Sequence, residues 1–202
     1  MRLDQKLRDS ALELVGLTSQ ATDRELLTAL AAVIQHPEQV GDTNDFSRLL
    51  ADIGDECFVQ PLIDKIVCGV PTETLWLADY MYALIELLNE CDDYYQVNEI
   101  FVNLLGDWLL NTQGGEISWK AGDILSEVDC PASKEYLMRG AADTSLFHLT
   151  RISCVRGIVN HFRDDARLLL QSLEDDSSQE VREACHRATV HLESIERRAQ
   201  QD

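Results

Sequence analysis

Residues 66–119 contain no lysine, arginine or histidine and are rich in acidic and aromatic side chains. Charge of one sign mixed with aromatic rings is typical of a surface that binds a basic protein. The alternative is a solvated acidic surface above an aromatic core. Nine acids lie in this stretch: Glu73, Asp79, Glu86, Glu90, Asp92, Asp93, Glu99, Asp107 and Glu116.

We expect the partner-binding side chains to come from one helix and from the segment that follows it. Asp79, Glu86 and Glu90 fall on one helical line, at spacings close to multiples of 3.6 residues. Glu86 and Glu90 repel each other at i,i+4, which costs a helix a few tenths of a kcal/mol, roughly. The predicted contact residues are Asp79, Tyr82, Glu86, Glu90, Asp92, Asp93, Tyr94, Tyr95 and Glu99.

Catalytic and metal-binding patterns are weak in this sequence. Gly114-Gly115 is a loop break and not a phosphate-binding pattern. His186 and His191 are five residues apart, so they do not share a helix face well. Asp79 and Glu86 would need an enclosed cleft to act as a general acid and base. The sequence therefore predicts no catalytic residue, no metal ligand and no cofactor.

The six cysteines occur far apart and form no C-x-x-C pair. Most of them lie in apolar helical contexts, as Cys68 and Cys154 do. Such cysteines act as small hydrophobic residues, and nothing in the sequence indicates an oxidising compartment. We expect them to be reduced and structural.

The formal net charge is −19, and most of it belongs to the middle of the chain. Residues 41–130 hold eighteen acids and three bases, which gives −15, whereas the segments before and after each carry −2. This field repels nucleic-acid phosphates and anionic lipid surfaces. It attracts basic proteins. The sequence thus argues against nucleic-acid and membrane partners.

No apolar run reaches the roughly 18–20 residues that a membrane span needs. The N-terminus opens a charged amphipathic helix and lacks the apolar segment of a secretory signal. We therefore expect a cytoplasmic protein.

The hydrophobic periodicity predicts helices along nearly the whole chain. Two capping boxes are expected, Thr22 with Glu25 and Ser177 with Glu180. His36-Pro37 ends the second helix because the residue before proline avoids the α region. We expect residues 1–40 to form a helical pair or cap, and residues 41–202 to form a helical-repeat region.

Two segments carry a resemblance to a known repeat family. Residues 53–63 (IGDECFVQPLI) look like the first helix of a short bacterial HEAT repeat, and residues 175–184 (DDSSQEVREA) look like the turn and second helix of one. The helix pairs after Pro131 recur at an offset of about 32–33 residues, which is typical of a solenoid. The resemblance implies an all-α, HEAT-like solenoid of roughly ten to eleven antiparallel helices. It covers residues 128–196 well and residues 45–90 in part.

Three functions are compatible with these observations. The first is a non-enzymatic acidic inhibitor that neutralises a basic protein such as a nuclease toxin; in charge and architecture the chain resembles the immunity proteins of bacterial toxin systems. The second is a HEAT-like scaffold or adaptor, and the third is a helical-repeat lyase or modifying enzyme. The sequence favours the first and leaves the oligomeric state open.

Overall fold

The computed structural model describes residues 3–90, 97–111 and 115–199. Within these ranges the chain forms eleven α-helices, two short 3-10 helices and no β-strand. The predicted all-α, helical-repeat fold is therefore confirmed. None of the described helices is long and apolar enough to cross a lipid bilayer. The cytoplasmic location remains a prediction.

The chain divides into two compact units, which we call unit 1 (residues 1–93) and unit 2 (residues 94–202). The predicted division after residue 40 remains a prediction. Unit 1 contains α1 (Gln5–Val15), α2 (Asp23–Ile34), η1 (Pro37–Gln39), α3 (Thr43–Ile53), η2 (Glu56–Phe58), α4 (Val59–Ile66) and α5 (Leu77–Glu90). Unit 2 contains α6 (Glu99–Asn111), α7 (Glu116–Ser126), α8 (Pro131–Ala142), α9 (His148–His161), α10 (Arg163–Ser172) and α11 (Gln179–Ala199).

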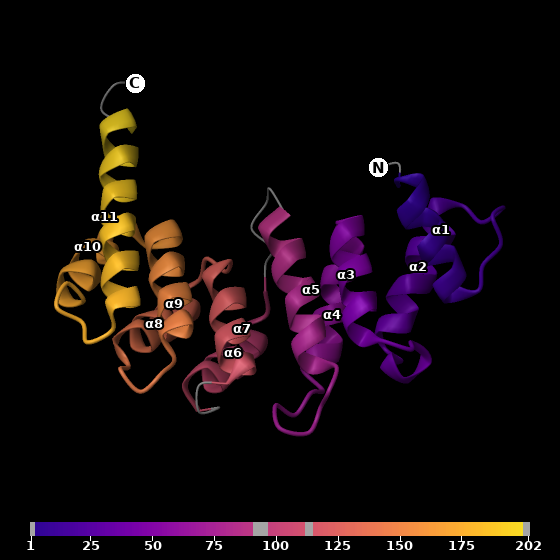
Figure 1. Ribbon diagram of the computed structural model, residues 1–202, viewed down its shortest axis with the longest axis horizontal. Helices are drawn as coiled ribbons and strands as arrows, with labels where there is room; N and C mark the ends of the chain where they lie inside the picture. The colour runs from indigo at the N-terminus through magenta and orange to yellow at the C-terminus, as the bar shows by residue number, and fades with distance from the viewer. Residues whose placement is uncertain (1–2, 91–96, 112–114, 200–202) are drawn as a thin grey trace. The chain divides into compact units, whose positions relative to one another are not determined.

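Unit 1 is built from two rows of helices. In one row α1 packs against α3 and α3 against α5, and in the other α2 packs against α4. Figure 1 shows α1 and α2 as the first pair of the unit. The core between the rows is apolar and includes an edge-to-face contact between Phe46 and Tyr80, with ring centroids 6.2 Å apart. Burial of such large side chains is the main stabilising contribution to the unit.

Local signals define where α1 and α2 begin and end. The Asp4 carboxylate accepts hydrogen bonds from the first turn of α1, which satisfies backbone N–H groups that lack a partner within the helix. Gly16 ends α1 with φ of +66°, a backbone conformation that glycine adopts without strain. The predicted capping box of Thr22 and Glu25 is present at the start of α2.

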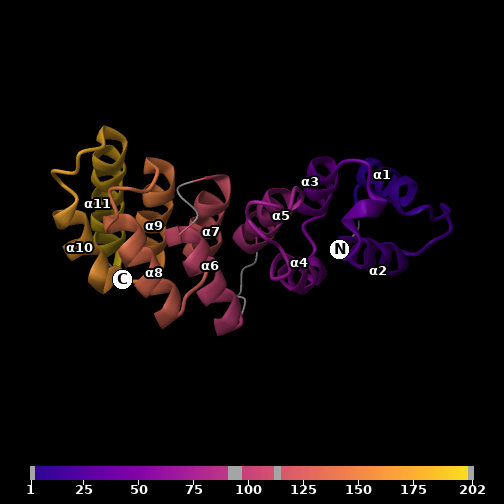
Figure 2. The same ribbon diagram turned by 90° about the horizontal axis from the view of Figure 1, so that it is seen from below.

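Unit 2 is a regular stack of three helix pairs. In one row α7 packs against α9 and α9 against α11; in the other α6 packs against α8, while α10 lies against α9 and α11. Figures 1 and 2 show the two rows within this unit. Each pair buries a face against the next pair, which is the arrangement of a helical solenoid.

A buried ion pair connects successive pairs of unit 2. The Arg151 side chain, 2% exposed, donates Nη1–H to Oδ1 of Asp176 at 2.8 Å and also pairs Nη2 with Oδ2. Its Nε donates to the carbonyl oxygen of Ala141 at 3.0 Å. Asp176 also accepts a hydrogen bond from the backbone N–H of Ser178, just before α11. The pKa of Asp176 lies below its ordinary value, chiefly because of the hydrogen bonds from Arg151.

Close helix contacts in unit 2 depend on glycines. A Cβ atom at Gly157 would lie 2.7 Å from the Cα atom of Ser126, so α9 approaches the backbone of α7 closely. A Cβ atom at Gly106 would meet the Tyr136 ring at 2.4 Å. The interior of unit 2 therefore has no room for an added methyl group at these positions.

Candidate functional site

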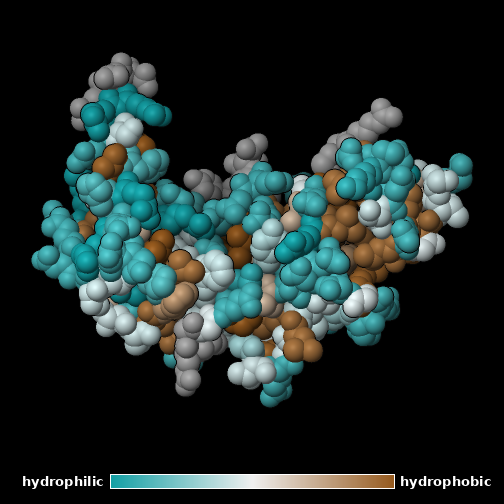
Figure 3. Space-filling view, in the orientation of Figure 1, coloured by the Kyte–Doolittle hydropathy of each residue, from teal (hydrophilic) through white to brown (hydrophobic). Residues whose placement is uncertain are grey.

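Helix α2 is covered by its neighbours over a narrow stripe only. Its buried residues are Leu26, Leu30 and Ile34, which lie one turn apart on one line. Leu27 and Ala31 are half-buried beside that line. Some apolar residues of α2 therefore lie outside the part of the helix that is buried within unit 1. In the space-filling view a hydrophobic area lies over α2 (Figure 3).

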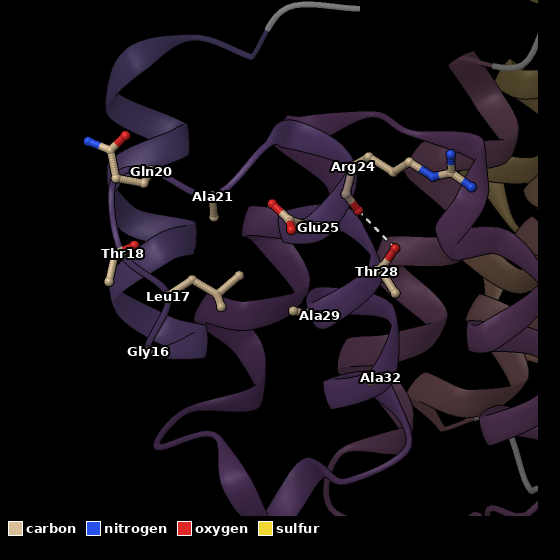
Figure 4. Close-up of a pocket in the computed structure, with 10 residues that line it drawn as sticks. All are labelled: Gly16, Leu17, Thr18, Gln20, Ala21, Arg24, Glu25, Thr28, Ala29 and Ala32. Carbon is tan, nitrogen blue, oxygen red and sulfur yellow. Dashed lines mark hydrogen bonds between the residues drawn. The ribbon is translucent and has the colours of Figure 1, made fainter.

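The side of α2 opposite the buried stripe forms one wall of a groove. We call Glu25, Thr28, Ala29 and Ala32 the outer face of α2, and the hollow above it the outer groove. The hollow has a volume of about 740 Å³ and is lined by α2 and by residues 16–18, 20 and 21 of the preceding segment. Figure 4 shows the Leu17 side chain directed across the hollow toward Ala29.

The outer face of α2 carries small side chains that project little from the helix. Three alanines, Ala21, Ala29 and Ala32, line the groove, and Leu17 on the opposite wall is 36% exposed. Small residues allow the backbone of a second helix to approach closely. The outer groove therefore has the shape and chemistry to accept an apolar stripe of a helix.

Two charged residues of opposite sign lie along this groove. The Glu25 carboxylate accepts hydrogen bonds through Oε2 from the backbone N–H of Thr22 at 2.7 Å and from its hydroxyl at 2.9 Å. These hydrogen bonds, the backbone one first, lower the pKa of Glu25. The Arg24 guanidinium forms no hydrogen bond or ion pair with any residue that the structure describes. In Figure 4 it extends away from Leu17, over the opposite side of α2.

A second hollow, the side groove, runs along the other flank of α2. It has a volume of about 490 Å³, and its walls include Asp23, Leu27, Ala31, Asp55 and Cys57. Arg24 and Thr28 line both grooves and form the ridge between them. Burial, and then the Asp55 carboxylate, raise the pKa of the Cys57 thiol to about 12, so the thiol stays protonated and is a weak nucleophile.

Unit 2 has a polar hollow of about 460 Å³ at the start of α10. Two of the charged groups around it form an ion pair: Lys134 pairs with Asp165, and it lies over the Phe162 ring. His161 shares a hydrogen bond of 2.8 Å with the carbonyl oxygen of Ser126. These contacts connect α10 to α8 and α9 to α7.

A network on α7 and α9 lies close to this hollow. Arg156 Nη2 donates to the Ser126 hydroxyl at 2.8 Å and contacts the carboxylates of Asp123 and Glu127 at 3.2 and 3.3 Å. Ser126 in turn donates to the carbonyl oxygen of Asp123 at 2.7 Å. The network links the two helices. Among the described residues no group of three His, Cys, Asp or Glu side chains is placed to hold a metal ion.

The predicted acidic line lies on α5, as the spacing indicated. Asp79 is half-buried and accepts hydrogen bonds from the Thr43 hydroxyl at 2.5 Å and the Asn44 amide at 3.3 Å, so it attaches α3 to α5. Tyr82 and Glu86 are half-buried. Glu90 is exposed, with its carboxylate against Gly54, where a Cβ atom would lie 2.6 Å from Oε2.

The remaining predicted contact residues do not complete a site. Asp92, Asp93, Tyr94 and Tyr95 lie outside the described residues. Glu99 is exposed at the start of α6, in unit 2. The role of all nine residues in binding a partner remains a prediction.

Sequence reasoning missed the outer groove. In the sequence nothing distinguishes Ala29 and Ala32 from the rest of the apolar pattern of α2, or Ala21 from the other residues of the loop before it. The signal that could have found them is the width of that pattern, because apolar or small residues occur on all sides of the helix. Which side stays uncovered depends on where α1 and α4 pack, and the sequence of α2 alone does not contain that information.

Three comparisons relate the chain to known proteins. No family model matches the sequence, and no curated protein matches it. Among solved structures, human deoxyhypusine hydroxylase in complex with glycerol is similar, with 18% identity and a TM-score of 0.37. The alignment covers 93% of this chain and 79% of that chain.

Two predictions are corrected on this comparison. The matched structure is that of an enzyme, which contradicts the prediction of a chain without enzyme activity and that of a non-enzymatic inhibitor or immunity protein. The error arose because net charge and architecture do not determine function. At this TM-score the likeness supports no substrate, cofactor or catalytic residue for the chain. The predicted basic partner remains a prediction.

Proposed function

We propose that unit 1 assembles with another polypeptide chain by packing a helix of that chain onto the outer face of α2. The observation that carries the proposal is the outer groove, a hollow of about 740 Å³ with Leu17, Ala21, Ala29 and Ala32 on its walls. Such a contact occurs in enzymes that act on proteins and in proteins without activity, so it leaves catalysis open.

The position of α2 in the unit supports this function. Helices α1 and α2 are the first pair of the two rows of unit 1, and a repeat helix whose outer face is uncovered stays soluble alone only if that face is polar. Here the outer face is formed by Glu25, Thr28, Ala29 and Ala32, and Leu17 on the opposite wall of the groove is part-exposed. A helix that covered it would remove apolar surface from water, at about 25 cal/mol per Å².

The shape of the groove favours a helix over a small ligand. The hollow is open to solvent along α2, which is 12 residues long and therefore about 18 Å in length. Small-molecule sites enclose most of their ligand's surface. A helix lying along α2 instead needs one open side, and this groove provides it.

The test compares the natural chain with Ala32→Arg in cells that make this protein. Ala32 is exposed in the last turn of α2, where a cation is favourable for the helix, so the variant should fold. We expect the natural chain to elute in an assembly larger than its own 22.8 kDa, and Ala32→Arg to elute at that mass. The matched control is Asp52→Arg on the exposed side of α3, which should keep the assembly.

A natural chain that elutes at its own mass, or an assembly that Ala32→Arg and Asp52→Arg leave equally intact, would refute the proposal.

A further inference from the structure

The segment between α4 and α5 carries several exposed hydrophobic side chains. We call residues 67–75 the α4–α5 connection; in Figure 1 it forms the lower end of this helix pair. Val67 is 43% exposed, Val70 is 46% exposed and Leu75 is 95% exposed. Single exposed apolar residues are common on proteins, whereas several within one short segment indicate a surface that contacts another molecule.

The α4–α5 connection is held in place by contacts on both sides of its last residues. The Thr74 hydroxyl accepts a hydrogen bond from the backbone N–H of Val70 at 2.8 Å. The Trp76 ring packs on the ring of Tyr80, with centroids 5.2 Å apart, and Tyr80 is fully buried. Leu75 is therefore presented to solvent between two fixed residues. A partner that covered it would order little additional backbone, which favours binding.

The exposed charges beside this apolar cluster are negative. Asp64 in the last half of α4 and Glu73 in the connection are both exposed. Lys65 is half-buried: its Nζ donates to the carbonyl oxygen of Gln35 at 2.9 Å and lies 5.0 Å from the centroid of the Trp76 ring. An acidic rim repels an anionic lipid surface and complements a protein surface that carries lysine or arginine.

We infer that the α4–α5 connection binds a protein whose apolar pocket is rimmed by lysine or arginine, and that the Leu75 side chain enters this pocket. Val67 and Val70 extend the apolar contact, while Asp64 and Glu73 face the basic rim. An apolar centre with a polar surround is the usual anatomy of a protein interface. The inference uses no residue of the outer groove and does not rest on the proposed function.

The test places a photo-crosslinking amino acid at Thr72, an exposed position of the connection, in the full-length chain in the cells that make it. We expect a crosslink to one protein, at a peptide in which apolar residues lie beside lysine or arginine. Leu75→Ser should lower the crosslink yield about tenfold or more, because it removes the apolar side chain that is buried on binding. Leu168→Ser is the matched control: Leu168 is 70% exposed on α10, and its loss should leave the yield unchanged.

A charge reversal tests the basic rim separately. Glu73→Lys places like charges opposite each other and should lower the yield several-fold. Glu13→Lys makes the same change of charge at an exposed position of α1 and should have no effect. Circular dichroism of the purified variants checks that each one folds.

The absence of any crosslink from position 72 would overturn the inference. So would equal yields for Leu75→Ser and Leu168→Ser, or for Glu73→Lys and Glu13→Lys. A crosslinked peptide without lysine or arginine, a crosslink to lipid, or a crosslink to a second copy of this chain would also overturn it, because each identifies a partner of different chemistry.

Discussion

Helix α9 of unit 2 and helix α2 of unit 1 belong to the same kind of helical stack, yet they are covered very differently. Helix α9 packs against α7, α8, α10 and α11, and eight of its fourteen residues are buried. Helix α2 is in the first pair of its unit, and three of its twelve residues are buried. The difference shows that α9 is enclosed by the helices around it, whereas α2 keeps one side uncovered within unit 1.

The chemistry of the two helices follows from this difference. In α9 a charged side chain, Arg151, is almost fully enclosed and needs Asp176 and a backbone carbonyl to offset the cost of burial. In α2 the arginine, Arg24, is exposed on a ridge between two grooves. The first arginine is part of the core, and the second is available for contact.

The largest expected effect on the free energy of unfolding comes from breaking the buried ion pair of Arg151 and Asp176. Arg151→Met removes the cation and leaves the Asp176 carboxylate without its charged partner in a nearly buried position, so unit 2 should lose about 3–5 kcal/mol of unfolding free energy. Urea unfolding measures the change. Arg187→Met on the exposed side of α11 is the control, and an equal effect of both variants would show that the pair is not structural.

A smaller effect is expected where α9 approaches α7. Gly157→Ala puts a Cβ atom 2.7 Å from the Ser126 backbone, so the helices must move apart at a cost of about 1–3 kcal/mol. Gly41→Ala, where no atom lies within 4 Å of the added Cβ, should cost far less. Thermal unfolding of the two variants compares them; equal midpoints would contradict the close packing described for unit 2.

The capping box of α2 should contribute less to the free energy of unfolding than the close contact of α9 with α7. Thr22→Ala removes the side chain that accepts from the Glu25 N–H and that bonds its carboxylate, which should cost about 1 kcal/mol. Amide hydrogen exchange in α2 reports the loss as faster exchange. Thr18→Ala, in the preceding loop, should not change these rates.

The smallest expected effect on stability belongs to the outer face. Ala32→Arg should change the unfolding free energy of the chain by less than about 0.5 kcal/mol, because the residue is exposed. The same variant should abolish assembly. Urea unfolding beside the assembly assay separates the two effects, and a loss of several kcal/mol would mean that the face is part of the core of unit 1.

Much of the fold follows from local signals in the sequence. Thr22 and Glu25 form the predicted capping box, and Pro131 begins α8 in the first-turn position that proline favours. The second predicted box is wrong: the hydroxyl that accepts from the backbone N–H of Val181 belongs to Ser178 and not to Ser177, and Val181 has no side-chain acceptor to complete a box. Two adjacent serines offer the same local chemistry, and the position of Asp176 decides between them.

The outer groove could not be predicted from the sequence, and the reason is physical. The high density of acidic residues predicted that Asp79 and its neighbours bind a partner. In the structure Asp79 instead accepts hydrogen bonds that hold α3 against α5. The outer face of α2 is made of residues that look like part of any apolar helix. It becomes a candidate site only because α1 and α4 cover other sides of α2 and leave this one open.

The most direct test of the account is a photo-crosslinking amino acid placed at Ala29, in the chain as it occurs in its own cells. We predict a crosslink from position 29 to a helix of another polypeptide chain, and none from position 52 on the exposed side of α3. A crosslink that Ala32→Arg abolishes would establish the outer face as the contact. No crosslink at position 29, or equal crosslinking at both positions, would contradict the account.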